Sequence, residues 1–296
     1  MCDKTFINID NMINNYAVIL TCFNRKDTTL RCLRQLYQQE TSSRMDVFLC
    51  DDASTDGTSE AIRKEFPQVH VVIGNGNLFW NRGMLTAWKE ACATKEYDAY
   101  IWLNDDVALY DGAIEEMMAC SSLCEDNSVI CGAFCTEDGT FSYGGKSKEN
   151  IALIPNEKLQ PVYWLNGNCV LVPNAVVKKI GLLDGMFQHH MGDFDYGLRA
   201  IEAGIGVYTS RKYVGVCASN PMASSRGRKS GKTLRQRFKI LYSPLGDNPI
   251  INFKYTRKHF GLKKAICIFL SLHINNLLSD RLYALKSTLG KNKKSK

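Results

Sequence analysis

The chain has 296 residues, of which 45% are hydrophobic and 23% charged, and its formal net charge is +7. This composition is typical of a globular protein large enough for one α/β domain with an appendage, and it excludes a fibrous or disordered chain. Residues 1–4 lack the features of a secretory signal, and no run of about 18 apolar residues predicts a membrane-spanning helix.

The charge is divided unevenly along the chain. Residues 211–296 contain 20 Lys and Arg against two acidic residues, whereas residues 1–210 contain 17 against 28. Such a basic segment is expected to meet an anionic partner or to be a solvated arm. No nucleic-acid-binding motif accompanies the charge, so we expect no nucleic acid and favour an anionic membrane surface.

The chain contains 12 cysteines, and four of them lie in apolar, strand-like runs: Cys22, Cys50, Cys131 and Cys169. Cys120 and Cys124, and likewise Cys131 and Cys135, are four residues apart and could share a helix face. No pair has the Cys-x-x-Cys spacing of a zinc or redox site. Buried free thiols in a reducing compartment are the preferred interpretation.

Strand-like and helical segments alternate over the first hundred residues. Apolar runs predict strands and apolar helical spacing predicts helices; in chain order the expected strands are 16–22, 47–50, 69–73 and 97–103, and the expected helices follow Asp27, Ser59 and about Arg82. Alternation with short connections predicts a mostly parallel sheet flanked by helices. Ligands of such sheets bind at the carboxyl ends of the strands, where polar residues 24–25, 51–56, 75–82 and 104–106 fall.

The alternation loosens after about residue 125. Further strands are expected at 128–134, 163–173 and 206–210, and a helix at about 193–203. Residues 219–235 have the composition of a loop. Residues 262–286 predict one or two amphipathic helices, and the expected apolar stripe is Leu262, Ile266, Phe269, Leu272 and Leu277.

An acidic pair, Asp105 and Asp106, follows the most apolar predicted strand. Carboxylates at the end of a buried strand are costly unless a cation pairs with them. A divalent metal that also binds a diphosphate would provide this pairing, since Mg²⁺ and Mn²⁺ accept carboxylate and phosphate oxygens together. The alternative is a solvated turn. We therefore expect Asp106 to bind Mg²⁺ or Mn²⁺, with Asp105 and His190 as further candidate ligands.

A second acidic cluster lies at residues 192–199. A carboxylate separate from the metal could remove the proton of an acceptor hydroxyl. Asp193 is the preferred base and Asp195 the alternative, although either could instead cap the predicted helix. Arg199 is four residues from Asp195 and could pair with it or contact an acceptor or phosphate.

Four segments together, 17–25, 51–58, 104–106 and 192–199, resemble the successive motifs of inverting glycosyltransferases of family 2, which have the GT-A fold. The resemblance covers roughly residues 15–215. It departs from the family pattern at Asn104, where a first Asp is usual, and at Gly192, where many relatives carry Glu. Residues 76–83 resemble bacterial members that build rhamnose-containing or related surface polysaccharides.

The resemblance implies a catalytic domain over 1–215 and a donor that is a UDP- or dTDP-linked sugar. The charge and the predicted amphipathic helices mark residues 216–296 as a basic C-terminal region. The resemblance and the positions of the strand ends together indicate the donor-binding residues. These are Thr21, Phe23, Asn24, Arg25, Asp52, Asn81, Arg82, Asn104 and Asp105. Aromatic and amide side chains suit sugar hydroxyls, so an acceptor-side wall is expected from Trp164, Asn166, Asn168 and Arg199. Cys217 stands near the position where many relatives have a metal-binding His.

The sequence thus predicts an inverting, metal-dependent glycosyltransferase that acts on a glycan or lipid-linked acceptor. It would work in the cytoplasm, peripherally at the inner face of the cytoplasmic membrane. One rival is a catalytically inactive membrane-surface binding protein of the same fold. Another is a sugar-phosphate nucleotidyltransferase, but residues 19–25 lack the glycine-rich phosphate loop that this reaction needs.

Overall fold

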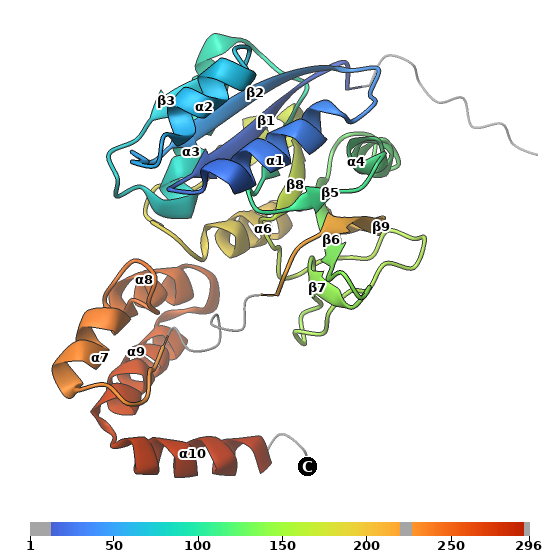
Figure 1. Cartoon of the computed structure of the whole chain (residues 1–296). Helices are drawn as coiled ribbons and strands as arrows, with labels where there is room; N and C mark the ends of the chain where they lie inside the picture. Colours follow the sequence, from blue (N-terminus) through green and yellow to red (C-terminus); the bar gives the residue numbers. More distant parts are fainter. Residues whose placement is uncertain (1–12, 220–226, 293–296) are drawn as a thin grey trace, which may run out of the picture. The chain divides into compact units, whose positions relative to one another are not determined.

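The computed structural model describes residues 13–219 and 227–292. The chain divides into two compact units, residues 1–219 and residues 220–296 (Figure 1). Residues 1–4, where we expected no secretory signal, and residues 220–226 of the predicted loop lie outside the described residues. The division into a catalytic domain over 1–215 and a basic region over 216–296 stays a prediction.

The first half of the first unit is a parallel sheet with helical crossovers. Its strands β1 (Asn15–Cys22), β2 (Arg44–Asp51), β3 (His70–Ile73) and β4 (Ala99–Leu103) lie in the order β3-β2-β1-β4. The connecting helices are α1 (Lys26–Tyr37), α2 (Thr58–Glu65) and α3 (Phe79–Thr94). This part matches the predicted alternation.

The second half extends the same sheet with mixed strand directions. Next to β4 lie β8 (Cys169–Pro173), β6 (Val129–Cys135), β9 (Val207–Val216) and β5 (Ala108–Leu109), while β7 (Phe141–Tyr143) pairs with β6. β8 is antiparallel to β4 and to β6, and β9 is parallel to β6. The helices of this half are α4 (Ala113–Ser122), α5 (Asn174–Ile180) and α6 (Gly192–Glu202). The mostly parallel α/β architecture that we predicted is confirmed.

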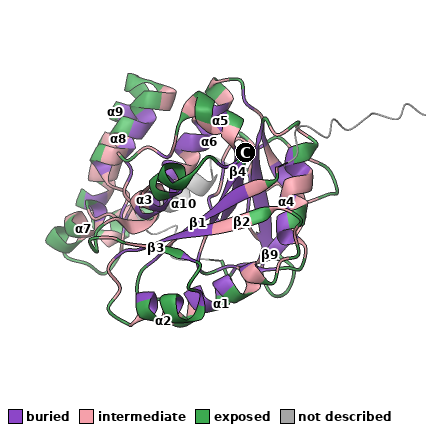
Figure 2. Ribbon diagram, turned by 90° about the horizontal axis from the view of Figure 1, so that it is seen from above, coloured by how far each residue is buried: buried purple, intermediate pink, exposed green. Residues whose placement is uncertain are grey.

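The core lies on both faces of this sheet. Alternate residues of β1 point to opposite sides, so Val18 packs in one apolar cluster with α1, whereas Ile19 packs in the other with α3. Figure 2 shows the central strands buried, with the exposed residues on the outer surfaces of the helices. A sheet covered on both faces explains why its strands read as continuous apolar runs.

Three predicted elements differ from the structure. The strand expected at 163–173 begins only at Cys169, and the strand expected at 206–210 continues to Val216. The first helix begins at Lys26, before Asp27, and Asp56 of the next loop accepts a hydrogen bond from the Lys26 amide (3.0 Å). A partner 30 residues away replaces a local cap, which sequence spacing alone does not reveal.

The second unit is helical. It contains α7 (Leu234–Leu241), α8 (Pro249–Phe260), α9 (Leu262–Leu277) and α10 (Asp280–Asn292). The predicted loop over 219–235 therefore gives way to α7 at its end, where Thr233 and Gln236 form a reciprocal capping box. Among the described residues, no helix is long and apolar enough to cross a membrane.

Candidate donor and acceptor site

The acidic pair at the end of β4 is held by one guanidinium group. Arg25 Nη1 lies 3.1 Å from Asp105 Oδ1 and 2.9 Å from Asp106 Oδ2. Asp105 is only 4% exposed and also accepts a hydrogen bond from Thr29 Oγ1 (3.1 Å). Burial raises the pKa of Asp105 to about 6, even though Arg25 opposes this rise. Asp106 is more open, with 41% of its side chain exposed.

Asn104 does not join this acidic pair. Its Oδ1 accepts a hydrogen bond from Trp80 Nε1 (2.7 Å), and its Nδ2 donates to Asn168 Oδ1 (3.2 Å). Asn168 Nδ2 in turn donates to Cys217 Sγ (3.3 Å). These four side chains, Trp80, Asn104, Asn168 and Cys217, form a continuous chain of hydrogen bonds, which we call the amide relay.

Asp193 lies beside this relay. It stands in the first turn of α6, where its Oδ1 accepts from the Phe194 amide (2.9 Å) and its Oδ2 from the Gly167 amide (3.2 Å). Gly167 directly precedes Asn168, so the loop 166–168 brings the second acidic cluster to the first. A side chain at Gly167 would clash, because its Cβ would lie 2.6 Å from the Trp80 ring.

Asp195 and Arg199 lie together inside the unit. Asp195 is fully buried, and Arg199 Nε donates to its Oδ2 (2.8 Å). Arg199 also donates to the carbonyl oxygens of Ile180 (2.6 Å) and Leu182 (2.8 Å). The contacts of this pair fasten α6 to the end of α5.

Asp52 shapes the loop between β3 and α3. Its carboxylate accepts hydrogen bonds from the amides of Gly76 (2.8 Å), Leu78 (2.8 Å) and Phe79 (3.0 Å). Neighbouring Asp51 accepts from the Ser54 amide (2.9 Å) and from the Ser59 hydroxyl. Asp52 therefore acts on this loop through backbone contacts, and a direct contact with a nucleotide stays a prediction.

The segment after β1 lies at the same sheet edge. Thr21 Oγ1 donates to the Cys50 carbonyl oxygen (3.0 Å), and the Phe23 side chain is half exposed. Asn24 has a positive φ of 50° and accepts from the Thr55 amide (2.7 Å). This contact ties the loop after β1 to the loop after β2, and Arg25 follows directly.

Two further predicted donor residues support the start of α3. Asn81 is fully buried and donates to the carbonyl oxygens of Asp184 (2.9 Å) and Phe187 (2.8 Å), while Arg82 Nε donates to that of Gly185 (3.0 Å). Asn81 also explains Gly192, where the family pattern often has Glu. A Cβ at Gly192 would lie 1.7 Å from Asn81 Oδ1, so this chain has no room for a side chain there.

The predicted acceptor wall and histidine lie around α6. The Trp164 ring meets the Phe194 ring edge to face, with centroids 5.9 Å apart, and Asn166 Oδ1 accepts from the Asn168 amide (3.3 Å). His190 stands beside His189, with ring centroids 6.2 Å apart. Trp164 and Asn166 thus border the loop that holds Asp193.

The described residues contain no group of three or more His, Cys, Asp and Glu side chains that could hold a metal. Two carboxylate oxygens do converge on one cationic atom, Arg25 Nη1. Cys217 accepts a hydrogen bond from Asn168 Nδ2, and burial raises the pKa of its thiol to about 12.

Sequence reasoning did not identify Thr29, Gly167 or the function of Trp80 at this site. Thr29 is a fully buried polar residue on the otherwise apolar face of α1, and that break in the pattern is the only sequence signal for it. Gly167 stands between two asparagines, which predicts a turn but not its partner.

Comparison with known proteins gives matches to glycosyltransferases. Residues 17–181 match the model of glycosyl transferase family 2. The chain is 25% identical over 234 residues to the N-acetylglucosaminyl-diphospho-decaprenol L-rhamnosyltransferase of Mycobacterium tuberculosis, covering 68% of this chain and 74% of that protein.

Solved structures share the fold at low identity. The mannosyltransferase PcManGT from Pyrobaculum calidifontis, in complex with GDP-Man and Mn²⁺, has a TM-score of 0.54 and 14% identity, covering 95% of this chain and 80% of that one. TarS from S. aureus has a TM-score of 0.55 and 12% identity, covering 90% of this chain but 44% of that one. Because the family model spans more than half of the sequence, the chain belongs to glycosyl transferase family 2 and transfers a sugar from a nucleotide-sugar donor.

Proposed function

We propose that this protein is an inverting, metal-dependent glycosyltransferase of the hexosyl type, in which Asp193 is the catalytic base. One observation carries the proposal: the amide relay and the loop 166–168 bring Asp193 next to the segment that bears Asp105 and Asp106. Two separate acidic segments are thus joined through the loop 166–168 at the end of β4. Transfer from a nucleotide diphosphate needs this separation, because a metal-bound carboxylate is a poor base.

Asp193 is suited to accept a proton. Two backbone amides orient its carboxylate, and a carboxylate can accept several hydrogen bonds, including one from an acceptor hydroxyl. As Asp193 takes that proton, the hydroxyl oxygen attacks the anomeric carbon from the side opposite the leaving diphosphate, which inverts the configuration. Asp195, the alternative base, is fully buried and paired with Arg199, so we prefer Asp193.

The acidic pair fits a hard divalent cation. One oxygen of Asp105 and one of Asp106 both lie close to the same cationic atom, Arg25 Nη1 (3.1 and 2.9 Å). Carboxylate oxygens are also ligands that Mg²⁺ and Mn²⁺ prefer. Asp106 would be the main protein ligand because it is the more exposed of the two, with Asp105 and His190 as further candidates. When bound, the metal would neutralise charge on the leaving nucleotide diphosphate.

Arg25 has a second part in this proposal. Without a donor its guanidinium pairs with both carboxylates and balances one of their two negative charges. A diphosphate offers the guanidinium a better bidentate partner, since Arg binds phosphate oxygens with its planar fork. Arg25 would then turn from the carboxylates to the donor and free Asp106 for the cation.

The donor would lie over β1 and β2, against residues 21–25 and the loop that Asp52 holds. UDP- and dTDP-sugars are the proposed donors, and UDP-GlcNAc is bound by TarS, one of the structures with this fold. The acceptor side would be formed by Trp164, Asn166 and Asn168. The mycobacterial relative is named for a polyprenol-linked substrate, and we propose a lipid-linked glycan here too, within surface polysaccharide synthesis.

A donor-hydrolysis screen tests the proposal. The full chain is incubated with UDP-, dTDP- and GDP-sugars with Mn²⁺ or with EDTA, and nucleotide diphosphate is measured together with the anomeric form of the released sugar. We expect metal-dependent release from one nucleotide class, with inverted configuration. No release from any donor would favour an inactive binding protein, and pyrophosphate release from a nucleoside triphosphate and a sugar phosphate would favour a nucleotidyltransferase.

A further inference from the structure

Helix α9 exposes apolar side chains to solvent. Leu262 is 53% exposed, Ile266 45% and Leu270 52%, and Ile274 and Leu277 continue the row. Steps of four and three residues place these side chains on one side of the helix. Exposed residues can be followed along α9 in Figure 2.

An adjacent side of α9 packs inside the second unit. Ala265 is fully buried, and Phe269 meets Phe253 of α8 edge to face, with ring centroids 6.0 Å apart. His273 accepts or donates a hydrogen bond with the Tyr242 hydroxyl (2.7 Å). A helix that is apolar on both its packed side and its solvent side needs a second apolar partner.

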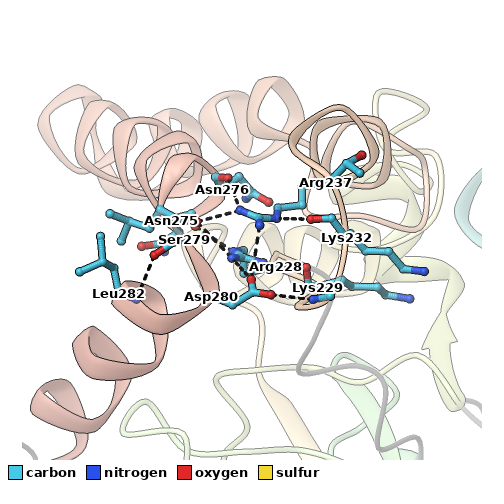
Figure 3. Close-up of polar contacts among 12 residues, drawn as sticks. Arg228, Lys229, Lys232, Arg237, Asn275, Asn276, Ser279, Asp280 and Leu282 are labelled. Atoms are coloured by element: carbon cyan, nitrogen blue, oxygen red, sulfur yellow. Dashed lines mark hydrogen bonds and ion pairs between the residues drawn. The ribbon is translucent and has the colours of Figure 1, made fainter.

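Helix α10 also exposes apolar side chains, since Leu282 is 53% and Leu285 54% exposed. The junction between the two helices is fixed by polar contacts (Figure 3). Arg228 is 7% exposed and donates to the carbonyl oxygens of Asn275 (2.9 Å) and Leu278 (3.2 Å) and to Asp280 Oδ1 (2.5 Å). A cation at the C-terminus of α9 also complements the helix dipole.

Arg237 of α7 strengthens the same junction. It donates to the carbonyl oxygens of Asn276 (3.2 Å) and Leu278 (2.7 Å), while the Gly231 amide donates to Asp280 Oδ2 (2.8 Å). The carbonyl groups of Asn275, Asn276 and the C-cap residue Leu278 are therefore satisfied, and polar contacts to Asp280 hold the start of α10. The two exposed apolar rows are thus held in a defined relation and do not depend on a partner to form.

The charge around this face favours a lipid surface. Residues 220–296 contain 18 Lys and Arg and two acidic residues. Lys263 and Lys264 are exposed at the start of α9, and Arg281 and Lys286 are exposed on α10. Pairing this face with a second copy would bring these cations together, whereas anionic head groups would neutralise them.

We propose that the exposed rows of α9 and α10, which we call the α9–α10 face, insert into the head-group region of an anionic lipid bilayer. The five apolar residues of α9, with Leu282 and Leu285, would reach the acyl boundary, and the lysines would contact the lipid phosphates. This deepens the membrane-linked acceptor of the proposed function by naming the surface that holds the enzyme there. Bilayer binding of this face does not require that the transfer reaction be assigned correctly.

Vesicle co-sedimentation of the full chain tests this face. Wild type is compared with Ile266→Glu/Leu270→Glu and with a matched control, Ile151→Glu/Ile154→Glu, which places the same charge on two exposed isoleucines of the first unit. Vesicles are phosphatidylcholine alone or mixed with phosphatidylglycerol. We expect wild type and the control to bind the anionic vesicles, and the α9 variant to lose about tenfold or more in affinity. Circular dichroism and donor hydrolysis verify that each variant is folded.

A probe on Cys267 gives a second readout. This thiol is exposed on α9 and can carry an environment-sensitive dye after Cys2, Cys92 and Cys124 are replaced by Ser. We expect a blue shift with anionic vesicles that salt weakens. Equal binding of both double variants, or no wild-type binding at all, would overturn the proposal. A wild-type dimer that Ile266→Glu/Leu270→Glu converts to a monomer, with no vesicle binding, would make the face an interface between copies. Retained donor hydrolysis in that case leaves the proposed reaction intact.

Discussion

Replacement of Asp106 separates the metal function from folding. The Asp106 carboxylate is 41% exposed and its partner Arg25 50% exposed, with 2.9 Å between Oδ2 and Nη1. An ion pair this open contributes about 0–1 kcal/mol to stability. Asp106→Asn and Asp106→Ala should therefore change the free energy of unfolding in urea by less than about 1 kcal/mol.

The effect on the reaction should be much larger. A metal that neutralises a leaving diphosphate stabilises the transition state by roughly several kcal/mol. Loss of about 3 kcal/mol of this stabilisation corresponds to about a 10²-fold lower rate. Because an amide brings no negative charge, Asp106→Asn should be nearly as inactive as Asp106→Ala. Both variants should also bind Mn²⁺ more weakly with nucleotide diphosphate present.

Manganese binding is measured by electron paramagnetic resonance, activity by donor hydrolysis and stability by urea unfolding. Asp111→Asn, at an exposed acid outside the site, is the matched control and should leave all three unchanged. Asp105 would make a poorer test, because its buried carboxylate also accepts from Thr29, and its loss would disturb folding. Activity that survives both Asp106 substitutions and EDTA would refute the metal assignment.

Three further predictions concern other carboxylates. Asp193→Asn keeps the side-chain shape but removes the base, so kcat should fall by about 10² or more with little change in donor affinity. If kcat falls in Asp195→Asn but not in Asp193→Asn, Asp195 is the base instead. Asp52→Asn cannot accept all three amide hydrogen bonds of its loop, and the donor KM should rise by about tenfold, as each 1.4 kcal/mol lost weakens binding by that factor. Glu116→Gln breaks the ion pair with Arg211 (2.7 Å) and should destabilise the fold by about 2 kcal/mol at neutral pH in urea unfolding. Burial raises the pKa of Glu116, but the hydrogen bonds from Arg211 and Cys120 and the charge of Arg211 together outweigh it, so the net pKa lies below its ordinary 4.5. The stability difference should hold above that pH and vanish as the carboxylate protonates below it; a difference that grows with acid would contradict this.

The sequence predicted the sheet well because its signals are local. Apolar runs that end in polar residues mark β1, β2 and β4, and strand ends of a parallel sheet meet at one edge. That argument was enough to place Asp52, Asp105 and Asp106 on the same side. It could not pair Arg25 with Asp105, since the two are 80 residues apart and no spacing rule connects them.

The stripe predicted on α9 was partly wrong for a related reason. The structure turns Leu262, Ile266 and Leu277 outward but packs Phe269 and Leu272 toward the unit, so the predicted row is divided between two sides. Periodicity identifies which residues share a face, but on a helix with apolar residues on two adjacent sides it does not identify the side that packs. The side of α9 that packs is decided by the positions of α7 and α8, which belong to the tertiary structure.

Asn104 shows how a departure from a family pattern can be explained by its contacts. Compared with an Asp-x-Asp pattern it is a missing ligand. In the structure its amide accepts from Trp80 and donates to Asn168 at once. A carboxylate could not donate to Asn168 Oδ1, and it would add a third negative charge near Asp105, whose pKa burial already raises to about 6. An amide here therefore links the loop of the proposed base to the acidic strand end without further charge, which leaves Asp106 as the main carboxylate open to a cation.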